Sequence, residues 1–232
     1  MHACLFELSD VFADPNQLPP TVLSTEASKW GYDQSLFVRM QKQQPKSVHL
    51  LRYVVCHEFL RVRVNTVYSI QYRMHPEISQ LPSQLFYDGR LKDGPDMDTK
   101  TRKVWHPDER FGPYKFYSVK NGIEESAHIG HSLINKAECR VILALFDRLR
   151  REYNSFDFDG KIGIVSMYKA QVQELKKTFQ IRYGPNIDEV VDFNTVDGFQ
   201  GQEKDIIILS CVRAGTNLNT VGFLAGKQMI NL

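Results

Sequence analysis

The sequence predicts an α/β fold, built on an open and mainly parallel sheet with helices on both faces. A short apolar run rich in β-branched residues at 161–168 is followed at once by a helical pattern at 170–182, which gives half of a strand–helix–strand unit. The run DIIILSCV at 205–212 is almost continuously apolar, as is typical of a central parallel strand covered on both faces. Ligands of such sheets collect beyond the carboxyl ends of the strands, so the loops there are candidate sites.

The other elements follow from the same patterns along the chain. Strands are predicted where apolar runs lie between turn residues, at 4–12, 114–119, 161–168, 190–196 and 205–212. Helices are predicted where apolar residues recur at helical spacing, at 35–41, 76–86, 135–153 and 170–182. Pro76 starts the second of these helices, whose apolar positions are Ile78, Leu81 and Leu85. Polar and Pro-rich residues predict connectors at 42–46 and 89–112, and a turn at Asp188 and Glu189.

The composition excludes several classes of protein. A hydrophobic content of 42% and a charged content of 24% are ordinary for a soluble globular protein. The net charge of +2 neither requires nor excludes a polyanionic partner, so any basic surface must be local. The four cysteines are far apart in the chain, which predicts reduced thiols and no metal site. No apolar run is long enough to cross a bilayer, and no signal-peptide pattern is present, so no membrane contact is expected.

The motif QYRMHP at 71–76 places an aromatic ring beside a guanidinium just before a helix that starts with proline. The ring of Tyr72 can stack on a purine, and the guanidinium of Arg73 can bind two phosphate oxygens at once. When an adjacent tyrosine and arginine occur without any further motif, they are more often a packed tyrosine next to a surface arginine. His75 is expected to cap or pack at the helix start rather than to act in catalysis. The motif therefore predicts a nucleotide site only together with further motifs.

Two further segments supply such additional motifs: ADPNQLPPTVLS at 13–24 and NTVDGFQGQEKDIIILSCVRA at 194–214. In this order the three segments resemble the later motifs of superfamily 1 helicases, specifically the senataxin branch of the group that also contains the nonsense-mediated decay helicase. The resemblance implies a RecA-like, P-loop NTPase-type sheet. It also implies an ATP-dependent helicase that moves 5′ to 3′ along single strands and acts on RNA or RNA:DNA hybrids, with ATP and Mg²⁺ as cofactors.

The resemblance also implies a role for each matching residue. Arg73 would be an arginine finger on the γ-phosphate, and Gln17 would report the terminal phosphate to the rest of the motor. Nucleotide binding is implied for Tyr72, Gln71, Gln200, Gly201 and Glu203. Contact with the nucleic-acid strand is implied for Thr195, Val196 and Asp197. Lys204 and Arg213 are interpreted as surface charges, and the Tyr72 and Gly201 loops are expected at one rim of a single sheet.

The chain departs from the family pattern in several places. It contains no Gly-x-x-x-x-Gly-Lys-Ser/Thr loop, no acidic pair at a strand end to hold magnesium, and no sixth motif after Ala225. Ala13 stands where the family has glycine. The segment 52–68 has no family counterpart, and it is either translated intron or a genuine surface loop, which would cost little closure entropy.

The predicted organisation is a tail of the first RecA-like domain at 1–45, a junction at 46–68 and a second RecA-like domain at 69–232, truncated before the sixth motif. Such a chain would supply one wall of an ATP cleft and part of the nucleic-acid track, and by itself it is predicted to be inactive. Its expected partners are single-stranded RNA or DNA and the missing first domain, in the nucleus or shuttling to the cytoplasm. The alternatives are a catalytically inactive nucleic-acid-binding module and a nonfunctional truncated gene product.

Overall fold

The structure, a computed structural model, describes residues 22, 24–43, 69–127 and 132–214. The chain divides into two compact units between Arg102 and Lys103. The strand expected at 4–12, the third motif and the insert at 52–68 lie outside the described residues. The domain boundary expected between residues 68 and 69 therefore stays a prediction.

The first unit is built around two short parallel strands joined by a helix. Its elements are α1 (Thr25–Lys29), α2 (Leu36–Gln43), β1 (Ser69–Gln71), α3 (Pro76–Phe86), β2 (Leu91–Asp93) and α4 (Met97–Lys100). Strand β1 pairs with β2 from Ser69 opposite Leu91 to Gln71 opposite Asp93. Helix α3 has the predicted bounds, because Pro76 occupies its first turn and the His75 side chain accepts a hydrogen bond from the backbone N–H of Glu77. The capping role expected of His75 is confirmed.

The buried face of α3 is not the apolar one. Ser79 and Ser83 are buried, and their hydroxyls donate to Asp93 Oδ1 at 2.6 Å and to the carbonyl of Leu91 at 2.7 Å. The apolar positions of the helix are instead 37–49% exposed: Ile78, Leu81 and Leu85. Short hydroxyl side chains let the helix lie close to β2, and this close approach fixes the loop that carries the QYRMHP motif.

The second unit contains the main sheet. Its elements are β3 (Glu125–Ser126), β4 (Leu133–Ile134), α5 (Lys136–Glu152), β5 (Ile162–Ser166), α6 (Lys169–Tyr183), α7 (Ile187–Val190), β6 (Val191–Thr195), α8 (Val196–Phe199) and β7 (Ile206–Ser210). Strands β3 and β4 form a small antiparallel pair. The other three strands are parallel in the order β6-β5-β7, with β5 in the centre and buried along its whole length.

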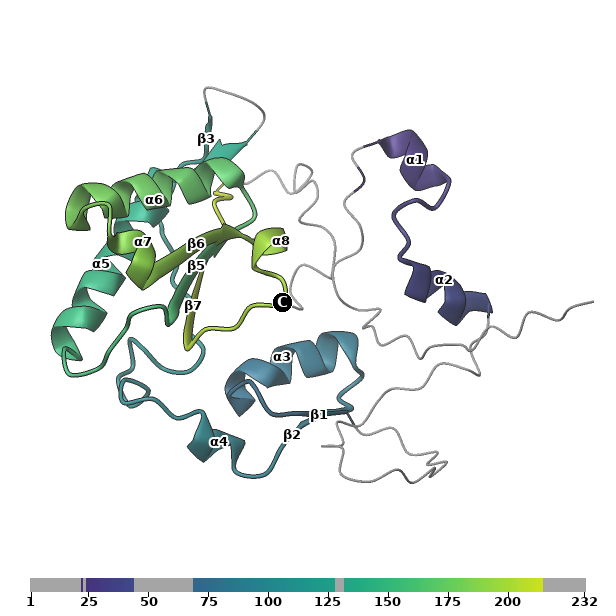
Figure 1. Ribbon diagram of the computed structural model, residues 1–232, viewed down its shortest axis with the longest axis horizontal. Coiled ribbons are helices and arrows are strands. Elements are labelled where there is room, and N and C mark those ends of the chain that lie inside the picture. Colours follow the sequence, from purple (N-terminus) through teal and green to yellow (C-terminus); the bar gives the residue numbers. More distant parts are fainter. Residues whose placement is uncertain (1–21, 23, 44–68, 128–131, 215–232) are drawn as a thin grey trace, which may run out of the picture. The chain divides into compact units, whose positions relative to one another are not determined.

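Helices lie on both faces of this sheet. On one face lie α5 and α6 (Figure 1). They pack there through Phe146, Leu175 and Phe179, which are completely buried. On the other face, α8 brings the ring of Phe199 over Gly163 of β5, where a Cβ atom would come within 2.8 Å of the ring. The predicted α/β architecture, with parallel strands and helices on both faces, is confirmed. Helices α5 and α6 lie within a few residues of their predicted bounds, and Asn135 caps α5 by accepting from the N–H groups of Ala137 and Glu138.

Several local predictions are wrong. Strand β7 is an edge strand in the described part of the chain, and its side chains Ile207 and Leu209 are 49% and 48% exposed, so it is not covered on both faces. The segment 114–119 forms no strand. The stretch 89–112 is not simply a surface loop, because Met97 and Trp105 are buried.

Two further predictions fail for reasons of pairing and local conformation. Asp188 and Glu189 lie in α7 rather than in a turn. The expectation that one sheet carries both motif loops is wrong for the described residues. Strands β1 and β2 pair only with each other, and the longer strands β5, β6 and β7 form a separate sheet. The loops of Tyr72 and Gly201 therefore belong to different sheets.

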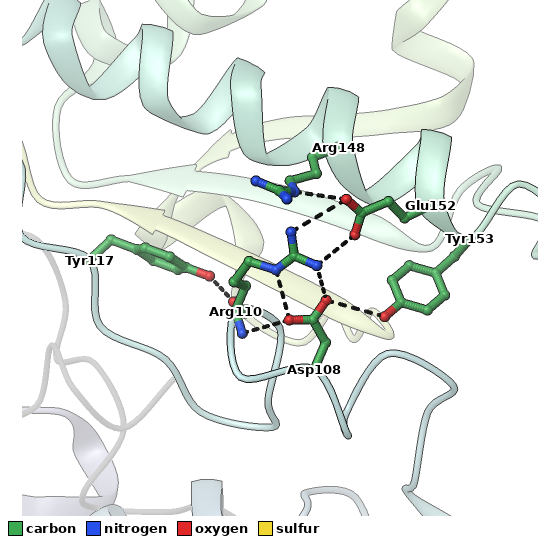
Figure 2. Close-up of polar contacts among 6 residues, drawn as sticks. All are labelled: Asp108, Arg110, Tyr117, Arg148, Glu152 and Tyr153. Carbon is green, nitrogen blue, oxygen red and sulfur yellow. Dashed lines mark hydrogen bonds and ion pairs between the residues drawn. The ribbon is translucent and has the colours of Figure 1, made fainter.

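A network of ion pairs fastens the loop after Trp105 to α5 (Figure 2). The guanidinium of Arg110 donates to both carboxylate oxygens of Asp108, at 2.8 and 2.5 Å, and to Glu152 of α5 at 2.9 Å. Arg148 also donates to Glu152, and the Tyr117 hydroxyl donates to the carbonyl of Arg110. The hydrogen bond from the Arg110 side chain is the main cause that lowers the pKa of Asp108 from 3.8 to about 2.

This pKa gives the network a defined pH dependence. A carboxyl group whose pKa is lower in the folded state stabilises the fold above its unfolded pKa, and the stabilisation disappears as the pH falls through the folded value. We expect Asp108→Asn to lower the melting temperature near neutral pH, and the difference from wild type to shrink as the pH falls from about 4 towards 2. Thermal melts followed by circular dichroism at a series of pH values measure this. A difference that does not change over this range would contradict the assignment.

Candidate nucleotide and nucleic-acid site

The side chain of Gln71 organises the motif loop of the first unit. It is 8% exposed, and its Oε1 accepts from the backbone N–H groups of Arg73 and Met74 at 2.8 and 2.7 Å. Its Nε2 donates to the carbonyl of Met74 at 2.8 Å and to Asp93 Oδ1 at 2.5 Å. One amide therefore uses both its donor and its acceptor to close the turn that presents Tyr72 and Arg73. Both presented side chains are exposed.

The ring of Tyr72 lies directly on Gly94, which follows β2. A Cβ atom on Gly94 would lie 2.3 Å from Tyr72 Cε1 and 2.4 Å from Cδ1, and the backbone N–H of Gly94 donates to the carbonyl of Gln71 at 2.8 Å. One face of the ring thus has backbone behind it, while 51% of the residue stays exposed. A flat ring that is supported from behind in this way is suited to stacking on a base.

A methyl group at Gly94 tests whether this support sets the position of the ring. We expect Gly94→Ala to push the Tyr72 ring out of place with little loss of stability, because an exposed ring can swing away. In protein carrying ¹³C-labelled tyrosine, NMR should show the Tyr72 ring signals shifting while those of Tyr114 stay unchanged. In a Tyr72→Ala background, Gly94→Ala should have no measurable effect on stability. A loss of stability as large in that background as in the wild type would show that the new methyl group does not meet the Tyr72 ring.

The second group of candidate residues lies where the parallel strands end. The strand register places Ser166 of β5 opposite Thr195 of β6 and Ser210 of β7, so all three strands end at one edge. Ser166 donates to the carbonyl of Ser210 at 3.0 Å, and Gln171, fully buried, donates to the Ser210 hydroxyl at 2.9 Å. The Ser210 hydroxyl in turn donates to Glu138 Oε2 at 2.6 Å. This buried network makes the edge rigid.

The loop TVDGFQGQE begins with a helix cap. The Thr195 hydroxyl accepts from the N–H of Gly198 at 3.2 Å, and Asn194 Oδ1 accepts from the N–H of Thr195 at 2.9 Å. Gly198 is needed because a Cβ atom there would lie 2.3 Å from Asn194 Oδ1. Gly201 has φ of +81°, a conformation that favours glycine, and no atom lies near the position of its missing Cβ. The backbone is therefore open to close approach by a ligand.

The side chains of this loop divide into exposed and buried ones. Asp197, Gln200 and Glu203 are exposed, and Thr195 is partly exposed. Val196 is only 1% exposed, so its side chain packs in the core and any contact of this residue with nucleic acid would have to use its backbone.

The cations Lys204 and Arg213 are held by the fold rather than free at the surface. Lys204 pairs with Asp192 and donates to the carbonyl of Gly160 at 2.7 Å. Arg213 pairs with Glu124 at 2.8 Å, and its pKa is raised above the usual value mainly by a hydrogen bond with Tyr168. The interpretation of both as simple surface charges is wrong. Just before Arg213, Val212 has φ of +68° and is fully buried, a strained conformation for a β-branched residue.

The predicted site residues fall into two groups. Gln71, Tyr72 and Arg73 lie together in the first unit, and the residues of 195–203 lie together in the second. Gln17 lies outside the described residues. Pattern reading did not single out Asp93, Gly94 and Asn194, although each fixes a motif loop. Only Asn194 had a local signal, since it directly precedes Thr195, the residue that caps α8.

Comparison with known proteins settles the family. A family model described as "AAA domain" matches residues 32–232. The chain belongs to this family of senataxin-like helicases. It is 47% identical over 220 residues to "Helicase SEN1" of Saccharomyces cerevisiae, covering 94% of the chain and 9% of that protein. It is 40% identical to "Probable helicase MAGATAMA 3" of Arabidopsis thaliana and 34% identical to "Probable helicase senataxin" of Homo sapiens.

The senataxin-like chain spans only a small part of these relatives, 9%, 25% and 8% of their lengths, and 94% of the chain is matched in each case. The match to the family model agrees with the parallel, helix-covered sheet, and the RecA-like fold expected from the motifs is confirmed. Among the described helices of the senataxin-like chain, none is long and apolar enough to cross a membrane.

Proposed function

We propose that this chain supplies the second RecA-like domain of an ATP-dependent helicase that acts on RNA or RNA:DNA hybrids in the nucleus. The observation that carries the proposal is the loop built by Gln71, which presents a guanidinium beside an aromatic ring that is supported by Gly94. The helicase relatives support the same proposal, since they share 34–47% identity over almost the whole chain.

The residues fit ATP in part. In the first unit, Tyr72 is proposed to stack on the adenine and Arg73 to contact the γ-phosphate. In the second unit, Gln200, Gly201 and Glu203 are proposed to contact phosphate and ribose. The open backbone at Gly201 suits close contact with phosphate oxygens. No three His, Cys, Asp or Glu side chains gather as a metal site in the described residues. The phosphate-binding loop and the Mg²⁺ ligands are proposed to come from the first RecA-like domain.

The nucleic-acid contact is proposed at the carboxyl edge of the main sheet. Thr195 and Asp197 would meet the strand there with their side chains, and Val196 with its backbone. The Thr195 cap and the network beneath Ser210 hold this edge in place. An edge of this kind contacts mainly the sugar–phosphate backbone of a bound nucleic-acid strand, so a preference for particular base sequences is expected to be weak.

A segment swap tests the proposal. In the yeast relative, residues 69–214 of this chain replace the matching segment, and ATP hydrolysis is measured with and without single-stranded RNA. The swapped protein is expected to keep RNA-stimulated hydrolysis, while the isolated 232-residue chain shows none, because phosphoryl transfer needs positioned phosphates and Mg²⁺.

The outcomes distinguish the proposed function from the two alternatives. A swapped protein that binds RNA but hydrolyses no ATP would favour a catalytically inactive nucleic-acid-binding module. An isolated chain that hydrolyses ATP, with activity lost on Arg73→Ala, would overturn the predicted dependence on a first domain. A nonfunctional truncated product would instead melt broadly, without a cooperative transition.

A further inference from the structure

The outer face of α5 carries a shallow groove that the proposed site does not use. The groove has a volume of about 440 Å³ and lies between the loop 118–121 and the first half of the helix. Its floor is aliphatic, formed by Val119, Ala137, Val141 and Ala144. The charged residues that line it are two cations, Lys120 and Arg140, and no carboxylate is among its lining residues, all of which the structure describes.

The positive charge of this groove is not neutralised locally. Lys120 and Arg140 are exposed, and neither has an ion-pair partner within the described ranges. The carboxylates next along the chain are already occupied: Glu124 pairs with Arg213 at 2.8 Å, and Glu125 pairs with Lys136 at 2.9 Å. The groove is therefore suited to an anionic ligand.

The basic character continues along the helix. Arg151 follows Arg140 by eleven positions, which places both on one exposed face of α5. Arg148 and Asp147 also lie on this side of the helix, but each is already in an ion pair, with Glu152 at 2.8 Å and with Arg182 at 3.6 Å. The opposite face of the helix packs in the core through Cys139, Ile142, Phe146 and Leu149. Two exposed cations on one helix face can each meet a phosphate of an extended polyanion.

Exposed aromatic side chains precede the groove in the chain. Phe116 is 81% exposed and Tyr114 is 54% exposed, with Lys115 between them. Aromatic rings interleaved with lysines are typical of surfaces that bind single strands, because the rings stack on bases while the cations hold phosphates. An acidic peptide would also meet the cations, but it would leave these flat rings in water.

The groove starts at the same edge of the sheet as the proposed nucleic-acid contact. Asn135, which caps α5, donates to the carbonyl of Val212 at 3.0 Å, just beyond the end of β7. Ala137 and Arg140 follow within the first two turns of the helix. The carboxyl edge of the sheet and the groove are thus parts of one compact unit.

We propose that this groove, with Lys115 and Phe116 beside it, is a second binding surface for single-stranded nucleic acid, in addition to the edge at Thr195 and Asp197. Lys120 and Arg140 bind backbone phosphates, the aliphatic floor takes sugar and base edges, and Phe116 stacks on a base. The proposal deepens and rests on the proposed function, because a helicase domain is expected to hold one strand along its surface.

The test is binding of a fluorescein-labelled 15-nucleotide uridylate strand to the full chain, followed by anisotropy at low and moderate salt. We expect Arg140→Glu to weaken binding about tenfold and to lower the slope of log affinity against log salt by about 0.7, the value for one lost phosphate contact on a single strand. Lys120→Glu combined with Arg140→Glu should weaken binding further. Phe116→Ala should weaken it at least about fivefold, with the salt slope unchanged.

The matched control is Lys177→Glu. Lys177 is an exposed cation on α6 without an ion-pair partner in the described part of the chain, so its reversal changes the net charge equally but should alter affinity less than about twofold. Circular dichroism melts check that each variant folds.

Two results would overturn the proposal. One is equal affinity of the Arg140→Glu and Lys177→Glu proteins for the strand. The other is unchanged strand binding together with lost binding of a glutamate-rich amphipathic peptide, which would make the groove a protein-docking surface. Failure of the proposed function is seen separately, as loss of ATP hydrolysis in the segment swap, which this binding experiment does not measure.

Discussion

Replacing Arg73 by alanine in the segment-swapped helicase is expected to lower RNA-stimulated ATP hydrolysis by about a thousandfold or more, the usual contribution of an arginine finger. The guanidinium would stabilise negative charge that develops on the transferred phosphoryl group, so the loss should appear in kcat rather than in KM for ATP. Arg73→Lys should not restore the rate, because an ammonium group cannot bind two phosphate oxygens in a fixed plane.

The control for this experiment is Arg90→Ala. Arg90 is an exposed arginine of the same unit, and it pairs with Asp88 at 2.9 Å, outside the motif loop. Its replacement should change the rate less than about twofold, since exposed ion pairs contribute little. Equal losses for the two variants, or a change in KM alone, would remove Arg73 from the catalytic role.

Replacing Phe146 by alanine is expected to lower the free energy of unfolding of the second unit by about 3–5 kcal/mol. Phe146 is completely buried between α5 and α6, and its ring meets those of Phe179 and Tyr183 edge to face, with centroids 5.1 and 5.5 Å apart. Removal of the ring leaves a cavity and breaks both aromatic contacts. A loss of this size would take away much of the stability of an ordinary domain.

Tryptophan fluorescence can follow this unit selectively. Of the two tryptophans, Trp105 is buried in the core of the second unit, whereas Trp30 is 77% exposed and belongs to the first. In a Trp30→Phe background, urea unfolding reports the second unit through Trp105 alone. The control Ile181→Ala, at a position 77% exposed, should change stability by no more than about 0.5 kcal/mol. A similar loss in both variants would mean that the core does not lie between these helices.

Sequence patterns predicted best those elements whose ends are marked by neighbouring residues. Helix α3 begins at a proline behind a capping histidine, and α5 begins behind a capping asparagine, so their bounds could be predicted from a few adjacent positions. Strand β7 could be located from its continuous apolar run. Its place at an edge depends on which strand pairs with it, and this information is not local.

The same distinction explains what could be predicted of the site. The motifs identified Tyr72, Arg73 and the loop 195–203 because those residues are contiguous. The residue that fixes the motif amide, Asp93, lies 22 positions from Gln71, and the contact of Gly94 with Tyr72 spans the same interval. The burial of Trp105 also depends on distant partners, chiefly Phe156 and Phe158, so a polar neighbourhood in the sequence wrongly predicted a surface loop.

The half-covered strand β7 has a consequence for work with the isolated chain. Its outer edge has no partner strand in the described residues, and Ile207 and Leu209 stand next to that edge with about half of their surface in water. Backbone amides without partners beside aliphatic side chains readily template pairing between molecules. High protein concentration is therefore expected to promote self-association of the isolated chain, and a polar residue at position 209 is the natural first change for a better-behaved sample.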